Sequence, residues 1–69
     1  MNKHPITFDN SADMQRLLRV EEVAALLNIS LPFAYRLMQR RQIPTVKFGR
    51  VVRVRLEDLK AYLEQNLQQ

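Results

Sequence analysis

Residues 20–41 have the sequence VEEVAALLNISLPFAYRLMQRR, and the expected architecture is built outward from this segment. Apolar side chains recur at helical spacing in its first part, at Val20, Val23, Ala24 and Leu27. This pattern predicts a short helix over 20–27. Arg19 is a poor N-cap, so Glu22 has only half a capping box available. Asn28 tolerates the left-handed conformation that stops a helix.

The second part of the segment predicts another helix over 31–41. Ser30 is a good N-cap, and Pro32 falls in the first turn, where its missing N–H costs nothing. The buried stripe is expected at Ala34, Leu37 and Met38. Only three residues separate the two helices, so they must cross steeply, and Ala24 and Ala34 are small enough for the crossing. Two short helices joined by such a tight turn indicate a helix-turn-helix.

Residues 45–48 and 52–55 alternate apolar and polar side chains around Gly49, the only glycine. This pattern predicts a β-hairpin. A three-residue loop over 49–51 would pair Phe48 with Val52 and Val46 with Val54 on the inner side. The outer side would then be basic, with Lys47, Arg53 and Arg55 on the strands and Arg50 at the tip. The hairpin is therefore expected to form a basic wing with an apolar underside.

A last helix is predicted over 56–67, with an apolar face of Leu56, Leu59, Leu63, Leu67 and Tyr62. Leu17 and Leu18 are expected to fold back on the core. The expected organisation is a mobile arm over 1–15, one domain over 16–67 and a frayed end over 68–69. The fold class is mainly α with a small β-hairpin, a winged helix-turn-helix.

The charges of the chain are segregated along the sequence. From Val23 to Leu56 there are seven cations and no acid, whereas all seven acids lie outside this stretch with four cations, a balance of +7 against −3. Like charges packed so densely repel one another unless a polyanion offsets the cost. Arg41 is expected to neutralise the dipole at the helix end. A solvated basic face is the simpler alternative, but six of the seven cations are Arg, which favours nucleic acid.

No catalytic or metal-binding group of residues can be assembled from this sequence. It has no Cys, and its one histidine, His4, lies in the arm without partners. No cofactor or enzymatic activity is expected. The apolar runs are too short to cross a bilayer. Together with the absence of Cys, this favours a cytoplasmic protein.

The geometry suits double-stranded DNA. An α-helix fits the major groove, and the exposed edge of the second helix offers Arg36, Gln39 and Arg40. The wing places further cations where phosphates or a minor groove would lie, at Lys47, Arg50, Arg53 and Arg55. The joint placement of these cations on helix and wing favours DNA over a set of solvated side chains.

Residues 17–63 resemble the excisionase-type helix-turn-helix family, small winged-helix proteins related to the MerR-type DNA-binding domain. The resemblance is carried by LLRVEEVA (17–24), LNIS (27–30), AYRLM (34–38), IP (43–44), VKFGR (46–50), VRV (52–54), EDL (57–59) and YL (62–63). It implies DNA-facing roles for Ser30, Tyr35, Arg36, Lys47, Gly49, Arg50 and Arg53. The chain departs from the family at Arg19, Asn28 and the apolar helix start Leu31-Pro32-Phe33, which can touch thymine methyls or a protein partner.

The chain is expected to be a monomer. The resemblance implies a bacterial or phage protein that binds neighbouring sites cooperatively, bends DNA and biases an integrase, a tyrosine or serine recombinase, toward excision. Two alternatives stay open. The same domain serves small transcriptional regulators. A protein of another class, an interaction module, would use Leu31-Pro32-Phe33 as its contact and the Arg cluster for an acidic partner.

Overall fold

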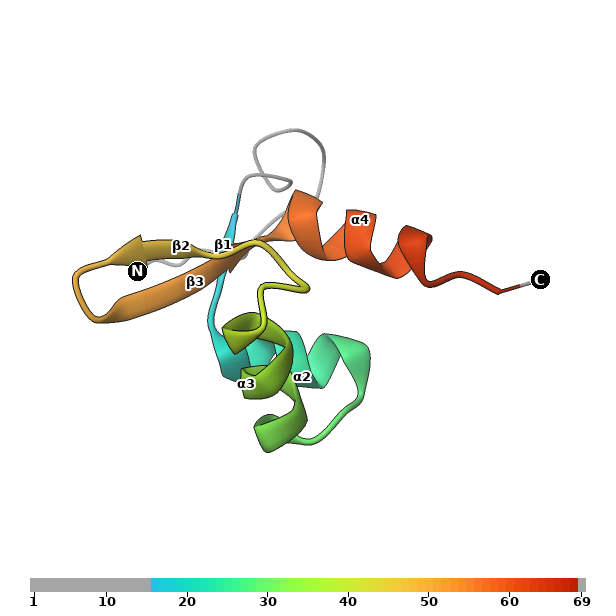
Figure 1. The fold of residues 1–69 in the computed structure, drawn as a ribbon, viewed down its shortest axis with the longest axis horizontal. Coiled ribbons are helices and arrows are strands. Elements are labelled where there is room, and N and C mark those ends of the chain that lie inside the picture. Colours follow the sequence, from blue (N-terminus) through green and yellow to red (C-terminus); the bar gives the residue numbers. More distant parts are fainter. Residues whose placement is uncertain (1–15, 69) are drawn as a thin grey trace, which may run out of the picture.

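The computed structural model describes residues 16–68 of the chain. Its elements follow in the order β1 (Leu17–Leu18), α2 (Val20–Leu27), α3 (Leu31–Gln39), β2 (Val46–Phe48), β3 (Val51–Arg55) and α4 (Leu56–Gln65) (Figure 1). The strands form one antiparallel sheet in the order β1-β3-β2. This architecture confirms the predicted class, mainly α with a hairpin wing. The arm predicted over 1–15 lies outside the described residues, and the domain boundaries stay a prediction.

The helix-turn-helix forms through the local signals that the sequence carries. The backbone N–H of Arg19 donates to Glu22 Oε1 at 2.9 Å, and an Arg side chain has no acceptor for the reciprocal bond, so half a capping box forms as predicted. Asn28 ends α2 at φ 58° and ψ 48°, in the left-handed region. Ser30 caps α3, its Oγ accepting from Phe33 N at 3.2 Å. The helix ends at Gln39, two residues earlier than predicted, because Arg41 adopts a left-handed φ of 59°.

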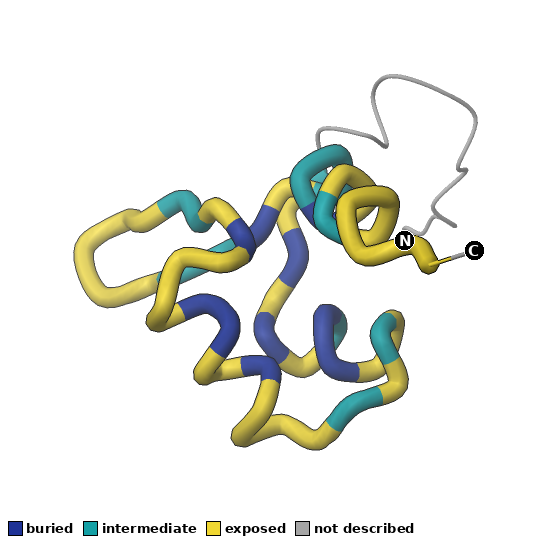
Figure 2. Tube along the Cα trace, turned by 45° about the vertical axis from the view of Figure 1, so that its right-hand side comes forward, coloured by how far each residue is buried: buried dark blue, intermediate teal, exposed yellow. Residues whose placement is uncertain are grey.

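The core lies where α2 and α4 pack against the sheet and α3 packs against α2 (Figure 2). All three residues of the predicted α3 stripe are buried, and so are both alanines expected at the helix crossing. None of the polar or charged residues described is buried. The fully enclosed side chains come from five different segments: Leu18, Val23, Ile43, Val54 and Leu59. The core is therefore small and aliphatic.

A third strand was not anticipated from the sequence. Leu17 and Leu18 pair with Arg55 and Val54 of β3, and the N–H of Leu56 donates to the carbonyl of Arg16 at 2.9 Å. Leu18 is fully buried, as expected of a residue that folds back on the core, whereas Leu17 stays exposed. The base of the wing is thus a three-stranded sheet.

The predicted hairpin register is wrong. The loop has two residues, Gly49 and Arg50, and the pairs are Phe48–Val51, Lys47–Val52 and Val46–Arg53. Gly49 has φ 60°, as expected of glycine at the first position of a two-residue type II′ turn, whose twist matches that of the strands. Phe48 is consequently 54% exposed instead of buried. The expectation failed because it required every apolar wing residue to face the core, while the helices cover only one face of the sheet.

The two-residue loop also divides the wing cations between the faces. Paired residues point to the same side of a sheet, so Lys47 shares the inner face with Val52, which packs against the core. Arg53 shares the outer face with Val46, and Arg55 shares it with Leu17. Arg50 is in the loop itself. The predicted common outward face of Lys47, Arg53 and Arg55 is therefore incorrect.

Candidate nucleic-acid interface

The predicted recognition residues of α3 lie together on its exposed side. The buried stripe of Ala34, Leu37 and Met38 holds the helix against α2 and fixes which side faces outward. Every residue predicted to contact DNA from this helix and its cap is exposed: Ser30, Pro32, Phe33, Tyr35, Arg36, Gln39 and Arg40. The exposed side thus carries two cations, two aromatic rings and an amide, groups that can contact base edges and phosphates.

Arg36 is positioned by a neighbour on its own helix. Its guanidinium carbon lies 5.6 Å from the centre of the Phe33 ring, one turn earlier. A cation over an exposed aromatic face gains about 0.5–1 kcal/mol. Phe33 is 41% exposed, so the ring and the charge stay accessible together. The sequence did not reveal this role for Phe33, although spacing of three residues on a helix is the signal that could have suggested it.

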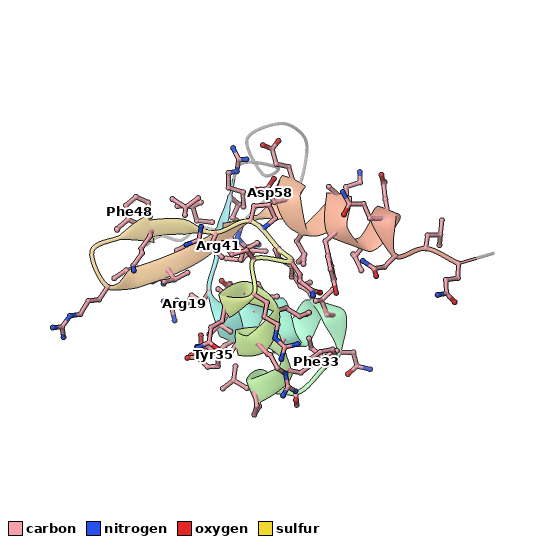
Figure 3. All side chains as sticks on the ribbon, viewed as in Figure 1. Arg19, Phe33, Tyr35, Arg41, Phe48 and Asp58 are labelled. Carbon is pink, nitrogen blue, oxygen red and sulfur yellow. The ribbon has the colours of Figure 1, made fainter. Side chains whose placement is uncertain are left out.

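Two grooves separate α3 from the wing. The first, of about 430 Å³, runs between the start of α2, α3 and the wing, and its lining includes Arg19 and Arg50. Arg53 also borders this groove, although its register places it with the outer-facing residues of the strand. The second, of about 290 Å³, lies at the end of α3 and includes Arg41 and Lys47. Tyr35, Met38 and Val52 line both grooves. In Figure 3, Tyr35 lies on the α3 side and Phe48 on the far side of the wing, so Phe48 points away from this interface.

Arg19 and Arg41 join the interface although sequence reasoning assigned them other roles. Arg19 lies outside the acid-free stretch and was considered only as a helix cap, and Arg41 only as a charge at a helix end. The left-handed backbone at Arg41 turns the chain after α3, and the residue then lines the second groove. Glu21 is the single carboxylate among the residues that line the first groove. Both arginines are recognised as interface residues only in the folded chain, because nothing in the sequence places them beside the grooves.

Most of these cations have no carboxylate partner within residues 16–68. The ion pairs found there join Arg16 to Glu22 and Arg55 to Glu57 and Asp58. Apart from Lys60 on α4, the cations without such a pair are Arg19, Arg36, Arg40, Arg41, Lys47, Arg50 and Arg53. The Arg53 guanidinium donates instead to the carbonyl of Val52 at 2.9 Å. A surface with this much uncompensated positive charge attracts a polyanion.

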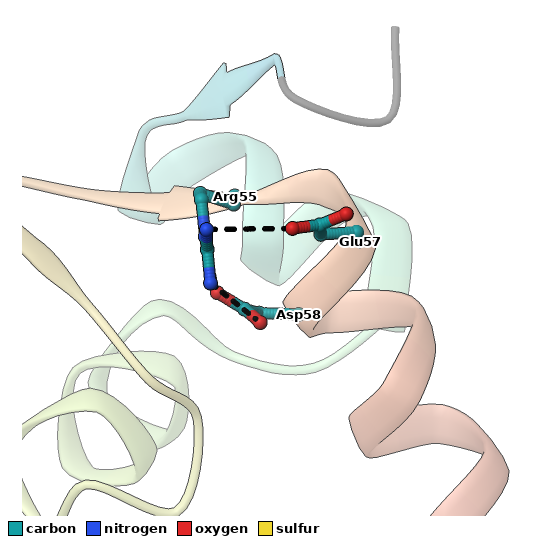
Figure 4. A network of polar contacts seen from close by, with 3 residues as sticks. All are labelled: Arg55, Glu57 and Asp58. Atoms are coloured by element: carbon teal, nitrogen blue, oxygen red, sulfur yellow. Dashed lines mark hydrogen bonds and ion pairs between the residues drawn. The ribbon is translucent and has the colours of Figure 1, made fainter. Parts of the chain in front are cut away.

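Arg55 differs from the other wing cations (Figure 4). Its Nε donates to Asp58 Oδ2 at 2.8 Å, and a second guanidinium nitrogen lies 3.4 Å from Glu57 Oε2. The hydrogen bond to Asp58, followed by the charge of that carboxylate, raises the pKa of Arg55 above its ordinary value. The two acids at the start of α4 thus compensate the charge of Arg55. Its role as a phosphate contact stays a prediction, and a phosphate would have to compete with both carboxylates.

Clusters of metal ligands and membrane-spanning helices are absent from residues 16–68. No three His, Cys, Asp or Glu side chains come together there to hold a metal ion. None of the helices there has the length and apolarity that a membrane span requires.

Comparison with known proteins identifies a family for the chain. A family model described as a helix-turn-helix domain matches residues 17–67. No curated protein and no solved structure matches the chain significantly. The matched residues include both helices of the turn motif, the wing and α4. The chain belongs to this helix-turn-helix domain family, and its function is DNA binding.

Proposed function

We propose that the chain is a sequence-specific DNA-binding protein that acts as an excisionase. In the proposed complex α3 enters the major groove, and the wing follows the adjacent backbone or minor groove. The observation that carries the proposal is the joint placement of α3 and the wing: Arg36 and Arg40 are exposed on α3, and the wing cations Lys47, Arg50 and Arg53 border the two grooves between these elements. The seven unpaired cations outside α4 fall on the start of α2, on α3 and the turn after it, and on the wing, which one duplex can meet together.

The proposed division of labour follows from the position of each cation. Arg36, held over Phe33 on the exposed side of α3, reads base edges, with Gln39 and Arg40 beside it. Lys47, Arg50 and Arg53 contact phosphates or the minor groove from the wing. Arg19 and Arg41 lie at the rims of the two grooves and are proposed to contact the same backbone. Phosphate contacts fix register and orientation, whereas base contacts specify sequence.

The excisionase role is supported by the resemblance of residues 17–63 to excisionase-type proteins. On this proposal the protein binds neighbouring sites cooperatively, bends the DNA between them and biases an integrase toward excision. It performs no chemistry itself.

The first experiment selects bound duplexes from a random pool and measures affinity for one selected site at several salt concentrations. Apart from Arg36, which reads bases, the six interface cations (Arg19, Arg40, Arg41, Lys47, Arg50 and Arg53) predict a log–log salt slope of about −4 to −6. Arg36→Ala should relax sequence preference, whereas Arg53→Ala should weaken all sequences and flatten the slope by about one unit. Lys60→Gln, which removes a cation from α4, is the matched control and should leave single-site affinity unchanged. Absence of micromolar binding at low salt would refute DNA recognition.

The second experiment tests the role in recombination. The selected site is searched for beside integrase genes, and excision by that integrase is measured with and without the protein. Stimulation that Arg36→Ala abolishes is the expected result. Specific DNA binding without any effect on excision would favour the transcriptional regulator instead. If an acidic protein competed for the cations while duplex DNA did not bind, the interaction module with Leu31-Pro32-Phe33 would be the better description.

A further inference from the structure

The apolar stripe of α4 continues beyond the core that it helps to form. Leu59 is buried and Leu56 packs against the core, but Leu63 is 50% exposed and Leu67, just past the helix end, is 68% exposed. All residues from Leu63 to Gln68 are exposed. Figure 1 shows α4 extending away from the wing toward the opposite end of the molecule. The outer part of α4 therefore presents leucines that nothing in the described chain covers.

A hollow lies beside these projecting leucines. A groove of about 240 Å³ is lined by Leu26, Leu56, Leu59, Lys60 and Leu63, four leucines and one lysine. Leu26 comes from the end of α2 and is 58% exposed. The same small surface thus offers both an apolar groove and apolar side chains that project. A two-fold interface between identical chains requires one surface to carry both the groove and the side chains that fill the groove of the other copy.

The charges beside the stripe are also self-complementary. Lys60 and Glu64 lie one turn apart on the same flank of α4. In an antiparallel pair of α4 helices, residues on the same flank face each other. A two-fold axis next to Tyr62 would set Lys60 of each copy against Glu64 of the other, which makes two opposite-charge pairs. In a parallel arrangement opposite flanks face each other, so Lys60 of one copy would not meet Glu64 of the other.

The rest of the charge distribution favours the same arrangement. Apart from Lys60, the unpaired cations lie on the start of α2, on α3 and the turn after it, and on the wing, so two copies facing each other there would repel. The groove beside α4 contains one cation, Lys60, and Glu64 follows it. Contact through α4 leaves α3 and the wing of both copies free for DNA.

We propose that α4 and the end of α2 form a docking surface for a second copy of this chain, with the two α4 helices antiparallel. Leu63 and Leu67 of each copy enter the groove beside α4 of the other. This self-association is a property separate from DNA binding, and it can be measured without DNA. If the chain does not self-associate, the proposed excisionase role is still tested by its own experiments.

Sedimentation equilibrium of the full chain over about 10 μM to 1 mM tests the proposal, and a reversible monomer–dimer equilibrium is expected. Leu63→Ser and Leu67→Ser should each weaken association on the order of tenfold, since each change removes an apolar contact twice in a symmetric dimer. Both side chains are exposed, so the variants should keep their fold by circular dichroism. Phe48→Ser removes an equally exposed apolar side chain from the wing and should leave association unchanged. A chain that stays monomeric at 1 mM would overturn the proposal, and so would equal effects of all three variants.

Charge reversal distinguishes this geometry from other ways of covering the leucines. Lys60→Glu and Glu64→Lys should each weaken self-association roughly fivefold or more, because each places two like-charged pairs at the interface. An equimolar mixture of the two variants should associate at least as well as the unmodified chain, since both mixed pairs are then opposite in charge. Failure of the mixture to recover would overturn the antiparallel arrangement. Leucine variants that lower stability without any concentration dependence would show that a segment of the same chain fills the groove, which also overturns it.

Discussion

Phe33→Leu is expected to weaken specific DNA binding by acting through Arg36. Leucine keeps an apolar side chain at the helix start but removes the ring face that lies 5.6 Å from the guanidinium carbon. Such an exposed contact contributes about 0.5–1 kcal/mol, which corresponds to roughly a two- to fivefold loss of affinity. Arg36→Ala should cost more, about 1–3 kcal/mol, because the base contact itself is lost.

A double-mutant cycle provides the assay. Dissociation constants of the unmodified chain, both single variants and the double variant are measured on the selected duplex and on random duplex at one salt concentration. If Phe33 acts by orienting Arg36, the double variant should bind no worse than Arg36→Ala alone. Additive losses would refute the reasoning, because Phe33 would then contact DNA independently. Equal losses on selected and random duplex would refute the assignment of Arg36 to sequence reading.

Three further predictions concern stability. Ser30→Ala removes the cap of α3 and should cost about 1 kcal/mol, lowering Tm by about 4–8 °C in thermal circular dichroism. Leu59→Ala should cost about 2–5 kcal/mol in urea unfolding, whereas Leu63→Ala in dilute solution should stay within about 0.5 kcal/mol, since only Leu59 is buried. Gly49→Ala should cost about 1 kcal/mol through its φ of 60° alone, because an added Cβ would meet nothing within 4 Å. Unchanged stability of that variant would contradict the two-residue turn.

The helix-turn-helix could be predicted in detail because its signals act locally. The bounds of α2, the left-handed Asn28 and the cap from Ser30 to the N–H of Phe33 each depend on residues within about one helical turn. The buried stripe of α3 follows from helical periodicity in the same way. Sequence therefore predicted which residues α3 would present to solvent, including Arg36.

Long-range features were decided only by the tertiary structure. The strand β1 exists because Leu18 meets Val54, 36 positions later, and two residues carry no recognisable strand pattern. Arg19 and Arg41 line the grooves because the fold brings them beside α3 and the wing. The charge of Arg55 is compensated by Glu57 and Asp58, two acids that the sequence assigned only to the helix dipole. The wing register depended on which face of the sheet the helices cover. A local pattern specifies alternation along a strand, but a shift of one residue moves every side chain to the opposite face, and only the packed core selects between the two registers.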